Sequence, residues 1–191
     1  MTCEVKIVMI GDSLAGKTSI VSQYCKHSFT DEDCATVGAY FVTKVVPTSG
    51  CTMCVHIWDT AGQERYRSLI PMYLRGAAAA ILVIDGSNAS SYDSIQPWYD
   101  TLADNRSQGC LVYLVVNKSD LEREVSMACV KEWADAAGVP VFETTAKEYS
   151  SIEPVFQRIA EDLSSKIQDV DDFGNATRRK LELKSEKKNC C

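Results

Sequence analysis

Two kinds of hydrophobic pattern alternate along the chain. Short runs that are almost entirely apolar predict buried β-strands, and segments in which apolar residues recur every three or four positions predict amphipathic helices. The expected strands lie at residues 4–10, 39–46, 51–58, 77–85, 110–116 and 139–143. The expected helices lie at residues 17–25, 67–75, 91–106, 125–137 and 152–167. Strands that alternate with helices indicate an α/β fold with a mostly parallel sheet.

Two local features refine this pattern. The segment 47–50, Pro-Thr-Ser-Gly, has the residues of a tight turn and lies between two strands, which predicts an antiparallel hairpin. We therefore expect a six-stranded sheet with one antiparallel strand, flanked by helices. Pro97 stands inside the helix expected at 91–106 and should kink it, because proline lacks the N–H that a helix interior uses.

The composition is that of one globular domain with a tail. The chain has 191 residues, of which 46% are hydrophobic and 24% charged, and this length suffices for a core without disulfides or metal. Apolar content falls after residue 168, and the segment 169–188 is polar and charged. We expect a domain at 1–168 and a flexible tail at 169–191.

Charge is unevenly distributed between these two parts. The net charge of −6 argues against a general nucleic-acid-binding protein. From Gly174 to the end, six Lys or Arg face two Glu, a net charge of +4, which leaves −10 on the rest. A basic tail on an acidic body favours an anionic partner for the tail, such as a membrane surface.

Nine cysteines, an odd number, stand in a chain without a segment typical of a secretory signal. This predicts a reducing, cytosolic environment. No apolar run approaches the 18 or so residues of a transmembrane helix. Cys51 and Cys54 form a CxxC pair, which we interpret as two strand residues, because nothing nearby completes the four ligands of a zinc site.

Residues 11–18, Gly-Asp-Ser-Leu-Ala-Gly-Lys-Thr, fit GxxxxGK[ST] between an expected strand and helix. Such a loop folds around an anion and points backbone N–H groups at phosphate. Lys17 would add charge near the β- and γ-phosphates, and the Thr18 hydroxyl suits Mg²⁺. A chance match is the alternative, and the strand–loop–helix context disfavours it. The residues expected to bind phosphate are Ser13, Leu14, Ala15, Gly16, Lys17, Thr18 and Ser19.

A second motif, Asn117-Lys118-Ser119-Asp120, follows an expected buried strand, where open α/β sheets bind ligands. A carboxylate only accepts hydrogen bonds. Asp120 can therefore accept from the ring N–H and the amino group of guanine, and adenine cannot satisfy it. Alone, this motif could be an ordinary turn after a strand, but the phosphate loop favours the guanine interpretation.

A third motif is the run 58–64, Trp-Asp-Thr-Ala-Gly-Gln-Glu. Asp59 ends an expected strand and is placed to hold Mg²⁺. Gly62 lets a backbone N–H approach the γ-phosphate, and Gln63 can orient an attacking water. Lys17, Gly62 and Gln63 are the expected catalytic residues.

With these motifs, the chain resembles the Ras superfamily of small GTPases and, within it, the Rab family. The resemblance spans residues 4–168 and the last two positions. Its Rab-like part rests on the segments 55–59 and 65–77 and on the ending 189–191, Asn-Cys-Cys. It implies a P-loop NTPase small G domain, which hydrolyses GTP to GDP as a switch in vesicle traffic.

The resemblance also assigns residues that no motif above covers. Thr36 would coordinate Mg²⁺ when GTP is bound, and Phe29 would cover the guanine face. Thr145 and Ala146 belong to the loop that meets the guanine carbonyl, and Lys118 and Lys147 would flank the base. Two prenyl groups on Cys190 and Cys191 would anchor the chain stably, whereas one lipid binds marginally; the alternative is a polar tail with two free thiols.

Partners follow from the same resemblance. We expect GTP and GDP with Mg²⁺, an exchange factor and an activating protein. No Arg is evident in cis at the catalytic position, so hydrolysis should be slow until the activating protein supplies one. Effectors would bind residues 30–41 and 60–76, and a prenyl escort and a chaperone of the GDP-dissociation-inhibitor type would handle the lipid. We expect a monomer on the cytoplasmic face of an endomembrane, with a soluble cytosolic pool.

Some positions depart from the family pattern. Leu14 and Ala15 make a bulkier phosphate loop, and Ser13 stands where many family members have Gly. Tyr40 stands where Rab proteins usually have Asp, and Thr145 replaces the usual Ser. The alternative function is a guanine-nucleotide-binding scaffold with little hydrolysis. A P-loop ATPase or nucleotide kinase is a third interpretation, which leaves Asp120 and the run 58–64 unexplained.

Overall fold

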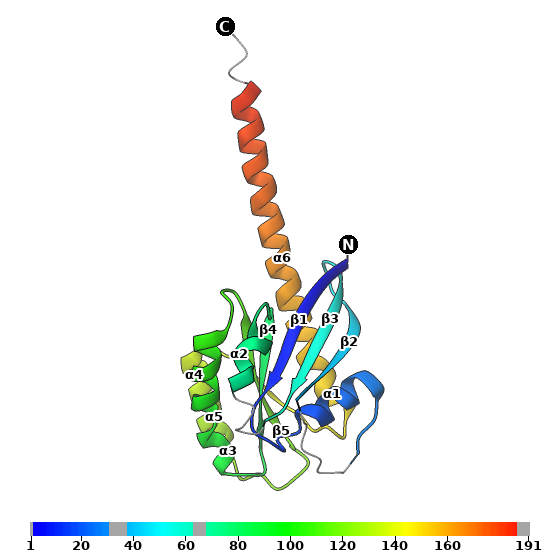
Figure 1. The fold of residues 1–191 in the computed structure, drawn as a ribbon, viewed down its shortest axis with the longest axis vertical. Coiled ribbons are helices and arrows are strands. Elements are labelled where there is room, and N and C mark those ends of the chain that lie inside the picture. Colours follow the sequence, from blue (N-terminus) through cyan, green and yellow to red (C-terminus); the bar gives the residue numbers. More distant parts are fainter. Residues whose placement is uncertain (1, 31–37, 63–67, 187–191) are drawn as a thin grey trace.

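The computed structural model describes residues 2–30, 38–62 and 68–186, with side chains as far as residue 167. Within these ranges, six strands form one sheet in the order β2-β3-β1-β4-β5-β6 (Figure 1). The strands are β1 Thr2–Ile10, β2 Ala39–Pro47, β3 Thr52–Thr60, β4 Ala79–Asp85, β5 Leu111–Asn117 and β6 Val141–Glu143. Every pairing is parallel except that of β2 with β3. The predicted mostly parallel sheet with one antiparallel strand is confirmed.

The predicted hairpin is also present. Pro47 pairs with Thr52, and the Thr48 N–H donates a 3.0 Å hydrogen bond to the Cys51 carbonyl across the turn. Cys54 lies on β3, and Cys51 precedes that strand. Among the described residues, no three His, Cys, Asp or Glu side chains gather closely enough to hold a metal.

Helices cover both faces of the sheet, as the side-chain alternation of β1 requires. The helices are α1 Lys17–Lys26, α2 Ile70–Leu74, α3 Ser90–Asp93, α4 Ile95–Asn105, α5 Met127–Ala137 and α6 Tyr149–Glu186. Ile7 and Met9 face a core that includes residues of α1 and α6. Val8 and Ile10 face a second core with residues of α2, α4 and α5. The loops after β1, β3 and β5 therefore leave the sheet between two packed layers.

The single kinked helix predicted at 91–106 is wrong. The structure has two helices, α3 and α4, which meet at Ser94. Pro97 has no N–H to donate to the carbonyl four residues earlier, so the break lies before it and a new helix begins at Ile95. In the first turn of α4 a missing N–H costs nothing, because first-turn N–H groups have no partner within the helix.

The last helix is longer than predicted. We expected a helix at 152–167 and a flexible tail from 169, but α6 begins at Tyr149 and runs to Glu186, extending away from the sheet (Figure 1). The segment 169–186 contains one glycine, Gly174, and no proline, and Lys, Arg, Glu and Leu in it favour helix. The division of the chain into 1–168 and 169–191 stays a prediction.

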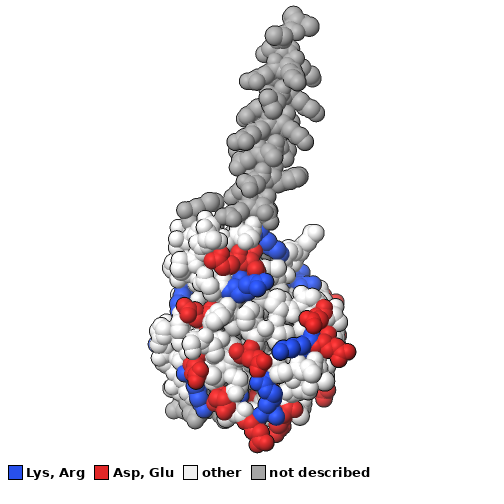
Figure 2. Space-filling model, turned by 180° about the vertical axis from the view of Figure 1, so that it is seen from behind, with Lys and Arg blue, Asp and Glu red and all other residues white. Residues whose placement is uncertain are grey.

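The surface mixes charges of both signs. On the face seen in Figure 2, basic and acidic side chains lie beside one another, and neither sign forms a broad field. Arg158 and Asp162, one helical turn apart on α6, are an example, with 2.9 Å between nitrogen and oxygen. Within the described ranges, no helix is both long and apolar enough to cross a bilayer.

Candidate nucleotide-binding site

The phosphate loop runs from the end of β1 into α1, and its glycines fit only as glycines. Gly16 has a φ of 93°, and a Cβ there would lie 2.2 Å from the side-chain nitrogen of Asn117. Gly62, which follows β3, approaches the loop from the other side. A Cβ on Gly62 would lie 2.4 Å from Lys17 Nζ and 2.5 Å from the Asp12 carbonyl oxygen. The first and third motifs therefore meet at van der Waals distance.

Lys17 lies inside the loop that it follows. Its side chain is 5% exposed, and Nζ donates to the carbonyls of Gly11, at 2.9 Å, and Asp12, at 2.6 Å. Burial lowers the pKa of this amine to about 8, although Asp59 and Asp12 act in the opposite direction. A bound anion would supply the countercharge that raises this pKa again.

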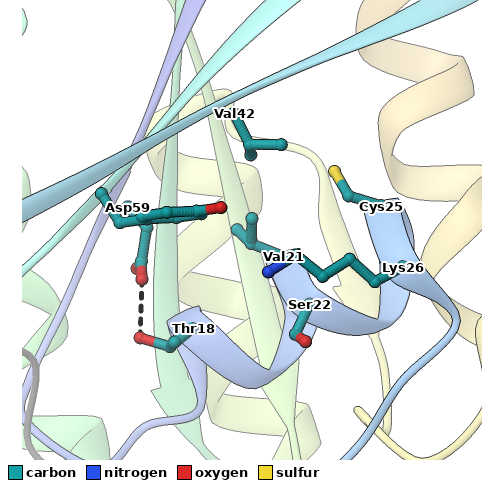
Figure 3. Close-up of a pocket in the computed structure, with 8 residues that line it drawn as sticks. Thr18, Val21, Ser22, Cys25, Lys26, Val42 and Asp59 are labelled. Carbon is teal, nitrogen blue, oxygen red and sulfur yellow. Dashed lines mark hydrogen bonds between the residues drawn. The ribbon is translucent and has the colours of Figure 1, made fainter.

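Thr18 and Asp59, both expected to bind Mg²⁺, are hydrogen-bonded to each other. The Thr18 hydroxyl donates a 2.6 Å hydrogen bond to Asp59 Oδ2 (Figure 3). Asp59 is fully buried, and its other oxygen, Oδ1, has no hydrogen-bond partner among the described residues. Burial raises the pKa of this carboxyl, against the hydrogen bond from Thr18 and the charge of Lys17. Carboxylate and hydroxyl oxygens are ligands that Mg²⁺ prefers, so this orphaned buried oxygen fits a cation.

A pocket between α1 and β2 opens beside this pair (Figure 3). Thr18 and Asp59 line one end of it, and Val21 and Val42 contribute to its walls. The position Thr36, expected to add a third oxygen to the metal, lies outside the described residues.

Asn117 connects the phosphate loop to the base-recognition end of the site. From the end of β5, its amide nitrogen donates to the Ala15 carbonyl at 2.9 Å, and its oxygen accepts from the Thr144 hydroxyl at 3.1 Å. The side chain is fully buried. Asn117, the first residue of the motif 117–120, thus connects the phosphate loop to the segment after β6.

Asp120 is exposed at the mouth of the site and already engaged. Its Oδ1 accepts from the Thr145 hydroxyl at 2.6 Å, and Oδ2 lies 2.8 Å from Lys147 Nζ. Desolvation acts to raise the pKa of this carboxyl, but the hydrogen bonds from Lys147 and Thr145 outweigh it and lower the pKa. The carboxylate is therefore held ionised and hydrogen-bond accepting. Ala146, between these two partners, is buried.

The two lysines expected beside the base belong to different loops. Lys118 follows β5 with a φ of 62°, and its Nζ lies 2.7 Å from Asp85 Oδ2. The Lys147 ammonium lies 5.8 Å from the ring centroid of Phe29, which is half-buried. The structure thus brings Phe29 and Lys147 together, as expected of residues around one base.

Sequence reasoning missed residues that support the site. Asp85 ends an apolar strand, and this signal could have identified it, since polar side chains at the carboxyl ends of parallel strands are candidates for function. Gln23 on α1 donates to the Lys147 carbonyl at 2.9 Å, and no sequence signal indicates this. Trp98 on α4 donates to Asp12 in the phosphate loop.

The remaining expected residues are placed as follows. Ser13 and Ser19 are half-buried in the loop and in the first turn of α1, whereas Leu14 is 52% exposed with a φ of 63°. The positions Gln63, Cys190 and Cys191 lie outside the described residues.

A parallel sheet whose first strand leads through a glycine-bounded loop into a helix is the architecture of the P-loop nucleotide-binding proteins. Within that class, the chain belongs to the Ras family, whose model matches residues 6–165. Its relatives further define it as a Rab-like small GTPase, a group whose general role is vesicle traffic.

These relatives come from distant organisms. The chain is 35% identical to the Ras-related protein Rab-5B of Plasmodium falciparum over 173 residues, 90% of this chain and 84% of that protein. It is 40% identical to Rab-11A of Dictyostelium discoideum over 156 residues, 81% and 73% of the two chains. It is 37% identical to Rab-31 of Rattus norvegicus over 194 residues, 98% and 97%. Proteins of this family are in general GTPases that use Mg²⁺ with guanine nucleotide.

Proposed function

We propose that this chain binds GTP and GDP with Mg²⁺, hydrolyses GTP slowly, and acts as a membrane-anchored switch in vesicle traffic. One observation carries the proposal: Asn117 joins the phosphate loop, through the Ala15 carbonyl, to the strand end that presents Asp120. A site for phosphates and a site for guanine are thereby fixed to each other. Family membership supplies the rest of the expectation.

The metal would be held by Thr18, Asp59 and Thr36. The buried Oδ1 of Asp59, which has no hydrogen-bond partner among the described residues, supports this, because a buried charged oxygen is costly unless a cation neutralises it. Bound Mg²⁺ supplies positive charge to the phosphate oxygens as they gain charge during hydrolysis.

Lys17 and the loop N–H groups would bind the phosphates. The Lys17 ammonium donates to two backbone carbonyls of the loop, so it lies among the groups that would surround an anion there. Gly62 would bring a backbone N–H to the γ-phosphate, and Gln63 would orient the attacking water. With no Arg assigned in cis, we expect slow turnover that an activating protein accelerates and an exchange factor resets.

Effectors would bind an aromatic surface that includes residues of the two expected effector segments. Trp58 lies between Phe41 and Tyr73, with ring centroids 5.4 and 5.9 Å apart. Phe41 is 48% exposed. Phe41 and Tyr73 fall within the expected effector segments 30–41 and 60–76, and Trp58 adds a residue that the sequence analysis did not include.

The tail would anchor the switch. Prenyl groups on Cys190 and Cys191, delivered by an escort protein and shielded by a chaperone of the GDP-dissociation-inhibitor type, would hold a monomer on the cytoplasmic face of an endomembrane. The basic residues before them would favour its anionic lipids.

The second candidate is a scaffold that binds guanine nucleotide with little hydrolysis. Leu14 favours it, because a bulky residue holds a φ of 63°, a conformation that suits glycine, and so strains the loop beside the expected phosphate site.

Single-turnover GTP hydrolysis with Mg²⁺, for wild type and Gln63→Leu and with ATP as competitor, separates these functions. We expect slow hydrolysis that Gln63→Leu abolishes and ATP does not affect. Tight GDP binding with no hydrolysis in either protein would favour the scaffold, and competition by ATP would contradict the role of Asp120.

A further inference from the structure

A buried tryptophan on α4 touches the phosphate loop. The indole Nε1 of Trp98 donates a 2.8 Å hydrogen bond to Oδ1 of Asp12, the second residue of the loop. Trp98 is 1% exposed and is among the largest fully buried side chains of the described residues. An indole N–H can only donate, and when it is buried it needs an acceptor, so the pair is a specific contact between distant elements.

Asp12 is the point at which three parts of the site meet. Its carbonyl accepts a hydrogen bond from Lys17 Nζ at 2.6 Å. The same carbonyl lies where a Cβ on Gly62 would come within 2.5 Å. A rotation of the Asp12 peptide would therefore move this carbonyl, and so change its contacts with both Lys17 and Gly62. Holding the Asp12 side chain restrains that peptide.

The other partner is well fixed. Trp98 packs in the core that includes Ile10, Ile70 and Leu74. Its backbone N–H donates to the Ser94 carbonyl at 3.2 Å, in the first turn of α4. The helix break at Ser94 thus sets where α4 begins and where this indole points.

We propose that Trp98 is a positioning residue of the nucleotide site: it holds Asp12, and thereby the backbone that receives Lys17 and Gly62, in the arrangement that retains the phosphates. The inference rests on the proposed function and deepens it, because it makes α4 a support of the phosphate loop.

The test uses two tryptophans of the same chain. Trp98→Phe removes the N–H and keeps an aromatic ring. Trp133→Phe is the matched control, because that half-buried indole donates to Gln96 Oε1 at 2.7 Å, on the α4–α5 surface. Dissociation of fluorescent GDP is measured for each. A hydrogen bond to a charged group is worth enough that Trp98→Phe should release GDP about tenfold faster than wild type. Trp133→Phe should match wild type.

A second pair of variants separates positioning from a general loss of stability. Asp12→Asn keeps an acceptor oxygen and Asp12→Leu does not, so Asp12→Asn should release GDP more slowly than Asp12→Leu. In the Trp98→Phe background this difference should become smaller, because the indole N–H that donates to Asp12 is gone. A purely structural tryptophan would leave the difference intact.

The outcomes are distinct. If wild type fails to retain GDP, the proposed function falls. If wild type retains GDP but Trp98→Phe releases it at the rate of Trp133→Phe, only the positioning role falls. The same holds if the difference between Asp12→Asn and Asp12→Leu is undiminished without the indole N–H.

Discussion

The amide of Asn117 donates a 2.9 Å hydrogen bond to the carbonyl of Ala15, across 102 positions of sequence. Both groups are buried, so Asn117→Ala leaves a buried carbonyl unsatisfied and should cost about 1–3 kcal/mol of stability. It should also release GDP faster, because the loop loses its tie to β5.

Asn105→Ala is the control for this variant. It removes an amide that donates only to the Thr101 carbonyl, within α4. Thermal unfolding and GDP release are measured for both proteins. Equal GDP release would contradict the role of Asn117 as a link between phosphate and base.

Asp120→Asn should change the preferred base. The carboxylate would accept from the two donors of guanine, and an amide turns one acceptor into a donor, so GDP should bind on the order of 100-fold more weakly. Xanthine has a carbonyl in place of the guanine amino group, and its diphosphate should bind the variant better than GDP. Equilibrium titration measures both nucleotides, with Asp135→Asn on α5 as the control. Unchanged preference would refute the assignment.

GDP affinity should depend on pH through Lys17. Its pKa is about 8 without ligand, and a bound diphosphate raises it by stabilising the ammonium. Binding then takes up a proton above pH 8, so the affinity is constant below that pH and falls by up to about tenfold per unit above it. Lys17→Arg keeps its charge and provides the baseline, because guanine also loses a proton in alkali. If GDP affinity falls equally with pH in wild type and in Lys17→Arg, Lys17 is not the group responsible.

Removal of the metal should act through the Thr18 and Asp59 pair. A chelator should speed GDP release from wild type, since the phosphates would lose the cation that we propose Asp59 holds. Thr18→Val should release GDP quickly with or without chelator. Thr101→Val, which removes a hydroxyl bonded to the Pro97 carbonyl on α4, should respond as wild type does. A chelator response in Thr18→Val equal to that of wild type would contradict the site.

Gln23→Leu should separate stability from binding. The Gln23 amide supports the Lys147 carbonyl, but its buried Oε1 has no partner among the described residues. Replacement loses one hydrogen bond, which destabilises the fold, and removes one unsatisfied group, which stabilises it. Each contributes about 1 kcal/mol to the free energy of unfolding, so the melting temperature should change little. The loop that contains Lys147, beside the expected site of the base, loses this hydrogen bond, so GDP should dissociate several-fold faster. Gln157→Leu, which removes a bond to the Pro47 carbonyl, is the control; identical release rates would exclude the role.

The sequence was most informative where the signal is local. β4 and β5 are apolar along almost their whole length, so residues adjacent in sequence identify them. The phosphate loop is likewise eight consecutive residues whose glycines meet steric demands that any chain in this fold must satisfy.

What the sequence did not reveal depends on packing between remote segments. Gln23 and Lys147 are 124 positions apart, and Trp98 and Asp12 are 86 apart. Neither pair has a sequence pattern of its own, because these contacts form only when α1, α4 and the loops pack together. The break at Ser94 was missed for a related reason: Pro97 suggested a kink, but whether a helix bends or restarts depends on its neighbours.

The length of α6 has a geometric consequence. At 1.5 Å per residue, its 38 residues extend about 57 Å. The first half packs against the core as far as Ile167, and in Figure 1 the second half points away from the end of the sheet at which the phosphate loop lies. If the chain is anchored beyond Glu186, this helix is a stalk that lifts the domain off the bilayer. The end of the sheet that carries the phosphate loop would then face away from that bilayer.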